Sequence, residues 1–199
     1  MTSQVHMTAG DRRESLIAAA VRVIRANGML ESSTRTVAKE AGVSVGLMHH
    51  YFASYDDLMA AAFERVALED LRRARAVVTA CANARERLDA VVTEFQPARD
   101  AWQFQWWMDA WSSSARHPAV REIAARINQR WQHLIEDILR EGVAQGEFTC
   151  ADPRASAWRL LALLDGLTIQ VVAQTDGPGR ADVERWSHHA ARVETGRAQ

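Results

Sequence analysis

Proline is absent from the first 96 residues of this chain, and the apolar residues there recur at the spacing of an α-helix. In the first such stretch Leu16, Ile17, Ala20 and Ile24 repeat every three or four positions, which places them on one helical face. Alanine is abundant and runs of β-branched residues are short, which also favours helix over strand. The sequence therefore predicts an all-α fold.

Proline and glycine turns divide this pattern into about nine helices and leave no convincing strand. We expect an N-terminal three-helix head at residues 11–52, followed by a linking helix at residues 56–80. The other helices form a C-terminal body and are predicted at residues 85–96, 98–114, 118–145, 153–174 and 180–194.

Composition and motif content argue against several classes of function. The formal net charge is −1, which is not the strongly basic balance of a free-standing DNA-binding module. Cys81 and Cys150 are far apart and match no metal or redox spacing. The chain has no H-E-x-x-H motif and no phosphate loop. We therefore expect no bound metal, no cofactor and no enzymatic activity.

The N-terminal region offers no apolar run for a signal peptide, because Arg12, Arg13 and Glu14 come early. The apolar run at residues 160–164 is far too short to cross a membrane. We expect a cytoplasmic protein that does not interact with membranes.

Two short helices that flank a glycine turn stand out in the head. They are predicted at residues 34–41 and 45–52, and Gly42 between them can adopt the left-handed backbone that the turn needs. Such a helix-turn-helix can place its second helix in the DNA major groove. From the spacing we expect burial of Val37, Ala38, Val43, Leu47, Tyr51 and Phe52, and an outer face of Val45, Gly46, Met48, His49 and His50.

The same bihelical pattern also occurs in all-α proteins that do not bind DNA, so its spacing alone does not establish the function. A protein-interaction adaptor and a helical-bundle enzyme are the two rival classes. The residues within the motif are more specific than its spacing, and they favour the DNA-binding interpretation.

Residues 36–58 read T-V-A-K-E-A-G-V-S-V-G-L-M-H-H-Y-F-A-S-Y-D-D-L. This segment closely resembles the signature of the TetR family of one-component repressors, I-A-x-x-A-G-V-S-x-G-x-x-Y-x-Y-F-x-S-K-x-x-L. The G-L-M-H-H-Y-F portion resembles the choline-responsive BetI branch. In the body, the segments W-Q-F-Q-W-W from Trp102, G-E-F from Gly146 and L-D-G-L-T-I-Q from Leu164 resemble the C-terminal domain of that branch.

The resemblance implies a transcriptional regulator, most often a repressor, that binds a palindromic double-stranded DNA operator as an Ω-shaped homodimer. It implies that Ser33 and Arg35 contact the DNA backbone, and that Val45 and Leu47 flank the bases or support the helix. The other expected DNA contacts are made by Ser44, His49 and His50, to phosphates or bases, and by Gly46, which lets the DNA approach closely.

Two positions depart from the family pattern. Tyr55 stands where the family usually has lysine, and we expect its hydroxyl to bond a phosphate with the loss of one charge. His49 stands where the family usually has tyrosine. Both departures can alter operator affinity and its salt dependence. Functionally, residues 1–55 are predicted to form the DNA-binding domain and residues 56–199 the ligand-binding and dimerisation domain.

The body is rich in tryptophan, and two i,i+4 pairs fall on one predicted helix. Aromatic faces near carboxylates suit a cationic amine, so we interpret this region as a small-molecule effector site. A flat aromatic or lipophilic effector fits as well, as in drug-efflux regulators, and tryptophans at helical spacing are also typical of core packing. The candidate ligand residues are Trp102, Trp106, Trp107, Asp109, Trp111, Trp131 and Asp165.

Residues 157–173 are apolar on nearly every side of the predicted helix. A helix of this kind must be buried on both sides, either against a partner subunit or as a central core helix. We expect a homodimer. The candidate interface residues are Trp158, Leu161, Leu164, Gly166, Ile169 and Val172.

Overall fold

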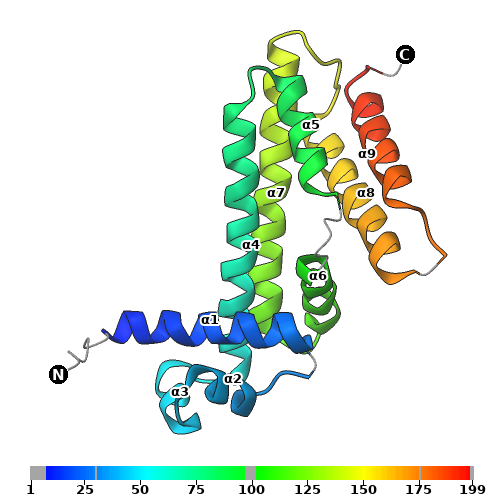
Figure 1. Ribbon diagram of the computed structural model, residues 1–199. Coiled ribbons are helices and arrows are strands. Elements are labelled where there is room, and N and C mark those ends of the chain that lie inside the picture. Colours follow the sequence, from blue (N-terminus) through cyan, green and yellow to red (C-terminus); the bar gives the residue numbers. More distant parts are fainter. Residues whose placement is uncertain (1–7, 30, 97–101, 175, 198–199) are drawn as a thin grey trace. The chain divides into compact units, whose positions relative to one another are not determined.

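The computed structural model describes residues 8–29, 31–96, 102–174 and 176–197, and within them the chain forms nine α-helices and no strand (Figure 1). The all-α prediction is confirmed. The predicted break at Pro97 and the predicted helix start at residue 98 lie outside the described residues. The helices are α1 (Ala9–Asn27), α2 (Thr34–Ala41), α3 (Val45–Tyr51), α4 (Tyr55–Ala80), α5 (Ala84–Glu94), α6 (Trp102–Ser113), α7 (Pro118–Ala144), α8 (Pro153–Ala173) and α9 (Arg180–Glu194).

Backbone proximity divides these residues into two compact units. The first unit runs to Ala67 and also contains Trp106–Ala124, so it holds α1–α3, the first half of α4, most of α6 and the start of α7. The second unit holds the described residues of 68–105 and 125–199, which include α5, α8 and α9.

Local capping explains where several helices begin and end. Thr8 and Asp11 form a capping box at α1, in which the Thr8 hydroxyl accepts a hydrogen bond from the Asp11 amide at 3.1 Å. Gly28 ends α1 with a φ of 78°, a backbone conformation that favours glycine. At α8, Asp152 is the N-cap and Pro153 occupies the first helical position, where its missing N–H costs nothing.

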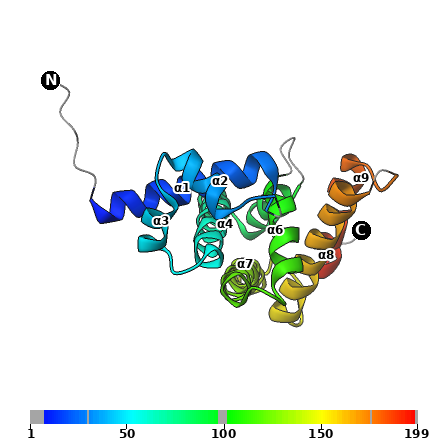
Figure 2. The same ribbon diagram turned by 90° about the horizontal axis from the view of Figure 1, so that it is seen from below.

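The first unit is built on α1, whose buried face packs against α2, and α3 then follows α2 (Figure 2). Within this unit Phe63 of α4 packs on α6, because its ring centroid lies 4.8 Å from that of Trp107 in an edge-to-face arrangement. His117 Nδ1 lies 2.8 Å from Asp56 Oδ2, which connects the residue before α7 to the first turn of α4.

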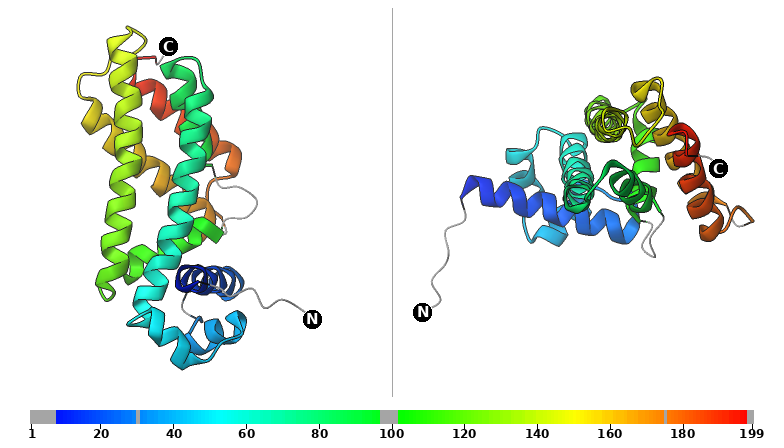
Figure 3. Two further views of the ribbon diagram at one scale, coloured as in Figure 1. Left: turned by 90° about the vertical axis from the view of Figure 1, so that its left-hand side faces the viewer. Right: turned by 90° about the horizontal axis from the view of Figure 1, so that it is seen from above.

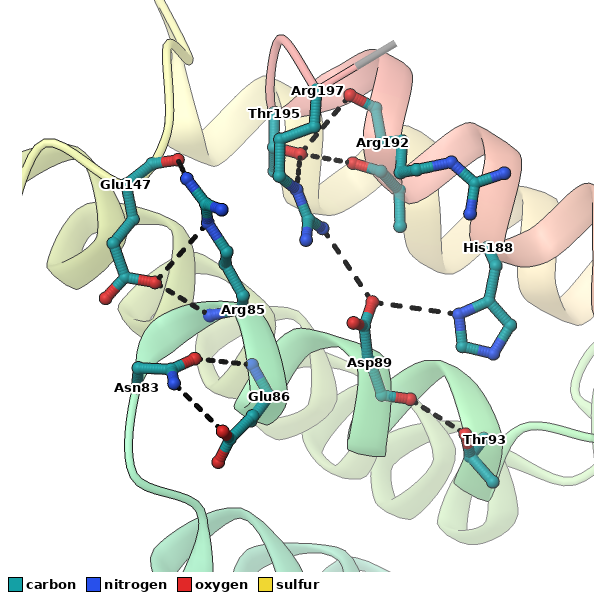
Figure 4. A network of polar contacts seen from close by, with 11 residues as sticks. Asn83, Arg85, Glu86, Asp89, Thr93, Glu147, His188, Arg192, Thr195 and Arg197 are labelled. Atoms are coloured by element: carbon teal, nitrogen blue, oxygen red, sulfur yellow. Dashed lines mark hydrogen bonds and ion pairs between the residues drawn. The ribbon is translucent and has the colours of Figure 1, made fainter. Parts of the chain in front are cut away.

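In the second unit α9 packs against both α8 and α5 (Figure 3). The Thr168 hydroxyl of α8 donates to the Phe95 carbonyl at 3.0 Å, and the Phe95 ring meets Trp131 of α7 edge to face at 4.9 Å. A polar network links α5 to the end of α9 (Figure 4). Within it Asp89 lies 3.7 Å from His188 and 3.8 Å from Arg197.

Helix α8 is long and apolar enough to cross a membrane by length and composition alone. The core helices of soluble proteins pass the same test, so one such helix is weak evidence for a membrane span.

Candidate nucleic-acid interface and effector region

Both helices of the helix-turn-helix start at a serine N-cap. The Ser33 hydroxyl accepts a hydrogen bond from the Thr36 amide at 3.2 Å, and the Thr36 hydroxyl accepts one from the Ser33 amide at 2.8 Å. The Ser44 hydroxyl accepts from the Leu47 amide at 3.1 Å. These caps fix the first turns of α2 and α3, and losing one typically costs about 1 kcal/mol.

The turn between the helices depends on Gly42, which has φ 67° and ψ 32°. Its amide donates to the Lys39 carbonyl at 3.2 Å, and the Val43 amide donates to the Ala38 carbonyl at 3.0 Å. These two bonds end α2 and turn the chain into α3. Residues 42–46 also fit the G-x-S-x-G spacing of a nucleophile elbow, but here the serine follows a helix instead of a strand and its hydroxyl caps α3.

Helix α3 presents a face that is shifted by one residue from the predicted one. Met48 is 2% exposed and Phe52 is 4% exposed, so this i,i+4 pair anchors the helix. Leu47 is 37% exposed and Val45 is 38% exposed. The expected burial of Leu47 and the expected outward position of Met48 are therefore wrong. Starting from Phe52, which the sequence did predict to be buried, the i−4 spacing identifies Met48.

The outward face of α3 combines apolar and hydrogen-bonding side chains. Gly46, His49 and His50 are exposed, beside Val45 and Leu47. Such a face offers imidazoles that can donate to phosphates or base edges, and aliphatic groups that can contact thymine methyls.

Exposed cations flank this face on α2 and α1. Arg35 is exposed and makes no ion pair within the described part of the chain. Arg22 is paired with Glu40 at 2.6 Å, and Arg13 lies over the Phe52 ring at 4.9 Å. Arg35 is therefore a predicted DNA contact whose charge is not used internally.

Tyr55 does not fit its predicted contact with a phosphate. It is the first residue of α4 and is half-buried, with its hydroxyl oxygen buried. Burial raises the pKa of Tyr55 to about 12. A lysine at this position could extend its ammonium to solvent along a flexible stem, but the rigid ring of Tyr55 keeps its hydroxyl inside.

The candidate ligand residues fall into separate groups. In the first unit Trp106 is 2% exposed and packs 6.1 Å from Phe63, while the half-buried Trp107 lies between Phe63 and Trp111, with a ring separation of 5.5 Å to Trp111. Asp109 is half-buried on the same helix and already has an interaction partner. Packing is therefore the role that the structure gives to Trp106.

The remaining candidates lie in the second unit. Trp131 is 8% exposed and packs on Phe95. Trp102 and Asp165 are half-buried. Burial raises the pKa of Asp165 to about 7, whereas the ordinary value is 3.8.

Comparison with known families decides between the rival classes. Residues 84–194 match the model of the BetI-type transcriptional repressor C-terminal domain, and residues 16–62 match that of the bacterial regulatory proteins of the tetR family. The chain belongs to the TetR family. It is a transcriptional repressor with a DNA-binding helix-turn-helix and a ligand-binding C-terminal domain, and it is not an enzyme.

Two curated relatives illustrate the range of this TetR-family neighbourhood. The transcriptional regulator BetI of Paraburkholderia xenovorans is 34% identical over 170 residues, which cover 80% of each chain. The nicotine-responsive transcriptional repressor HdnoR of Paenarthrobacter nicotinovorans is 29% identical over 177 residues, covering 87% of this chain and 90% of the relative.

A solved structure of similar fold is a transcriptional regulator from Saccharomonospora viridis in complex with choline. It is 29% identical, superposes with a TM-score of 0.80, and the match covers 93% of this chain and 96% of that one.

The predicted dimer residues on α8 of this TetR-family protein differ in how deeply they are buried in their own chain. Leu161 is 2% exposed and Leu164 is 1% exposed, so both belong to the core of their own chain, and their expected place in a dimer interface is wrong. Gly166, Ile169 and Val172 are half-buried. The large apolar side chains that remain exposed on α8 and α9 are Trp158, Leu163, Trp186 and Val193.

Proposed function

We propose that this repressor binds a palindromic operator as a homodimer through the outward face of α3, and that a small cationic amine releases it. The observation that carries the DNA-binding part is the exposure of Val45, Leu47, His49 and His50 on a helix that Met48 and Phe52 anchor from behind. We assign residues 1–55 to DNA binding and residues 56–199 to ligand binding and dimerisation, in a cytoplasmic protein.

The roles within the interface follow from position. Arg35, Ser33 and Ser44 stand at the first turns of the two helices and are assigned to the DNA backbone. Val45 and Leu47 are assigned to the bases, and Gly46 between them allows close approach because its position leaves open space around a β-carbon, with Ser44 Oγ at 3.9 Å.

Because the chain is nearly neutral, we expect tight operator binding to need two such heads. The formal net charge of −1 gives one head little attraction for DNA beyond its own exposed cations. Two heads on one dimer act as linked binding modules, and linkage raises affinity without new contacts. The exposed apolar residues of α8 and α9 support a second copy as the partner.

The names of the relatives support a cationic effector. One relative responds to nicotine, and one solved neighbour holds choline. Both ligands are organic nitrogen compounds that can carry a positive charge. Aromatic rings and a carboxylate are the groups that bind such cations, and the body of this chain supplies both.

Fluorescence anisotropy with labelled DNA from upstream of the gene tests this function. We expect the protein to bind this DNA at low salt and to release it when choline or putrescine is added. Arg35→Ala should weaken binding about tenfold and lower the salt dependence, since one phosphate contact is lost. Arg72→Ala is the matched control, because Arg72 is exposed on α4 and pairs with Glu69. No binding of the upstream DNA at low salt would contradict the proposal.

A further inference from the structure

A histidine in the turn between α6 and α7 contacts the helix that follows α3. His117 is the residue before α7, and its Nδ1 lies 2.8 Å from Oδ2 of Asp56, the second residue of α4. Both residues belong to the first unit, which also contains α3. Because α3 ends at Tyr51 and α4 begins at Tyr55, this contact joins the α6–α7 turn to the chain just beyond α3.

The contact between His117 and Asp56 depends on charge. Nδ1 of His117 is shielded from solvent and has no hydrogen-bond partner among the described residues, so the Asp56 oxygen lies off the direction of an N–H bond. An off-axis contact of a neutral imidazole with a carboxylate gains little, and it is repulsive if Nδ1 carries the lone pair. A protonated ring attracts the carboxylate at the same distance. The contact is therefore favourable only when His117 is charged.

Of the groups around this contact, the imidazole is the one that changes charge near neutral pH. The side chain of His117 is 35% exposed, so protons reach the ring, and histidine ordinarily titrates between pH 5 and 8. The neighbouring Tyr55 stays neutral, because burial raises its pKa to about 12. Carboxylates and guanidinium groups ordinarily keep their charge in this range. Those of the same unit that can act on the pair are Asp57 and Glu64 on α4, Asp109 on α6, Arg25 on α1, and Arg116 and Arg121 next to His117 in the chain.

Without a charged partner Asp56 opposes DNA binding. It is an acidic group in the first turn after α3, and charges interact over about 8 Å at physiological salt, so it repels the phosphates of a bound operator. A protonated His117 cancels this charge. It also fixes the first turn of α4 to the α6–α7 turn, which lowers the cost of ordering that turn on binding. Both effects favour operator binding when His117 is protonated.

We propose that His117 positions the first turn of α4 through Asp56, and that this contact makes the repressor bind its operator more tightly at lower pH. The inference rests on the proposed function, in which α3 binds the operator. His117 acts through Asp56 and is a positioning residue. His49 and His50 on α3 also gain charge at lower pH, with an effect of the same sign. A pH dependence of the wild type alone therefore does not identify His117, and variants are needed.

Fluorescence anisotropy with the labelled upstream DNA, at pH 6 and pH 8 and at one salt concentration, tests the proposal on four proteins. They are wild type, His117→Gln, Asp56→Asn and the double variant. His117→Gln should weaken DNA binding about threefold to fivefold at pH 6, the range of a partly exposed ion pair, and by less than about twofold at pH 8. In the Asp56→Asn background the same substitution should have no effect at either pH.

Two other histidines serve as controls. His133 is exposed on α7 but belongs to the second unit, so the matched control His133→Gln should leave DNA binding unchanged at both pH values. His49→Gln removes an imidazole of α3 itself, and its effect should be equal with and without Asp56→Asn. Circular dichroism and thermal melting on every variant show that each is folded.

The proposal is wrong if His117→Gln binds the DNA as tightly as wild type at pH 6. It is also wrong if the loss is equal at pH 6 and pH 8, because the role of His117 is then structural and independent of its proton. A loss that persists in the Asp56→Asn background rules out Asp56 as the partner. In these three cases DNA binding by α3 still stands. A wild type that binds the upstream DNA at neither pH contradicts the proposed function, and this inference with it.

Discussion

At the scale of single residues, Gly142 shows how closely the backbone of α7 approaches a neighbouring side chain. A β-carbon at this position would lie 2.1 Å from Cδ2 of Phe148. The Phe148 ring is 4% exposed and Arg197 lies 5.0 Å over it, so it has little room to move. Gly142→Ala should lower the free energy of unfolding by about 1–3 kcal/mol, measured by urea titration. Gly10→Ala, whose nearest contact would be at 3.7 Å, should cause no loss; equal effects would contradict this account.

Asp165 also affects stability, apart from any ligand. Its pKa is about 7 in the folded chain against an ordinary 3.8, so folding favours the protonated form. The stabilisation is complete below the ordinary value and is lost as the pH rises through about 7. Asp165→Asn should therefore be more stable than wild type near pH 8. Its free energy of unfolding, measured by urea titration, should be higher by up to roughly 4 kcal/mol, since each pKa unit is worth about 1.4 kcal/mol. The advantage should shrink toward about pH 5, and a constant difference would contradict burial as its cause.

At the scale of one element, α3 separates stability from DNA binding. Met48→Ala removes a buried side chain and should cost about 2–4 kcal/mol of unfolding free energy. Leu47→Ala changes an exposed side chain, so it should leave stability within about 0.5 kcal/mol and weaken operator binding. Urea titration and fluorescence anisotropy on both variants check this pair. If instead Leu47→Ala lowers the free energy of unfolding and Met48→Ala only weakens operator binding, α3 has the orientation that was expected from its sequence.

The error at α3 has a physical reason. Helix positions follow from local features such as the Ser33 and Ser44 caps and the Gly42 turn, and these are visible in the sequence. The buried face of a seven-residue helix is set by the helices it packs on, because two turns contain more than one possible i,i+4 pair. The buried hydroxyl of Tyr55 likewise depends on packing that no local pattern contains.

At the scale of the whole molecule, the sequence predicted that α8 is apolar on nearly every side. Two of its leucines were expected in the dimer interface but are buried in the core of their own chain. Hydrophobicity alone marks Leu161, Leu163 and Leu164 as equivalent. The structure separates them, since Leu161 and Leu164 fill the chain's own core and Leu163 is 38% exposed. The tryptophans of α6 were ambiguous for the same reason, because pattern cannot distinguish core from pocket.

The exposed side chains of α8 and α9 give the sharpest test of dimerisation. Leu163→Glu should convert a dimer to a monomer in light scattering, since a charge at a buried interface lacks a partner. The monomer should stay fully helical, because Leu163 is not part of the chain's own core, and should bind the palindromic operator about a hundredfold more weakly. Val77→Glu is the matched control, as Val77 is 39% exposed but lies on α4. If Leu163→Glu stays dimeric, or if Val77→Glu dissociates equally, the α8–α9 face is not the interface.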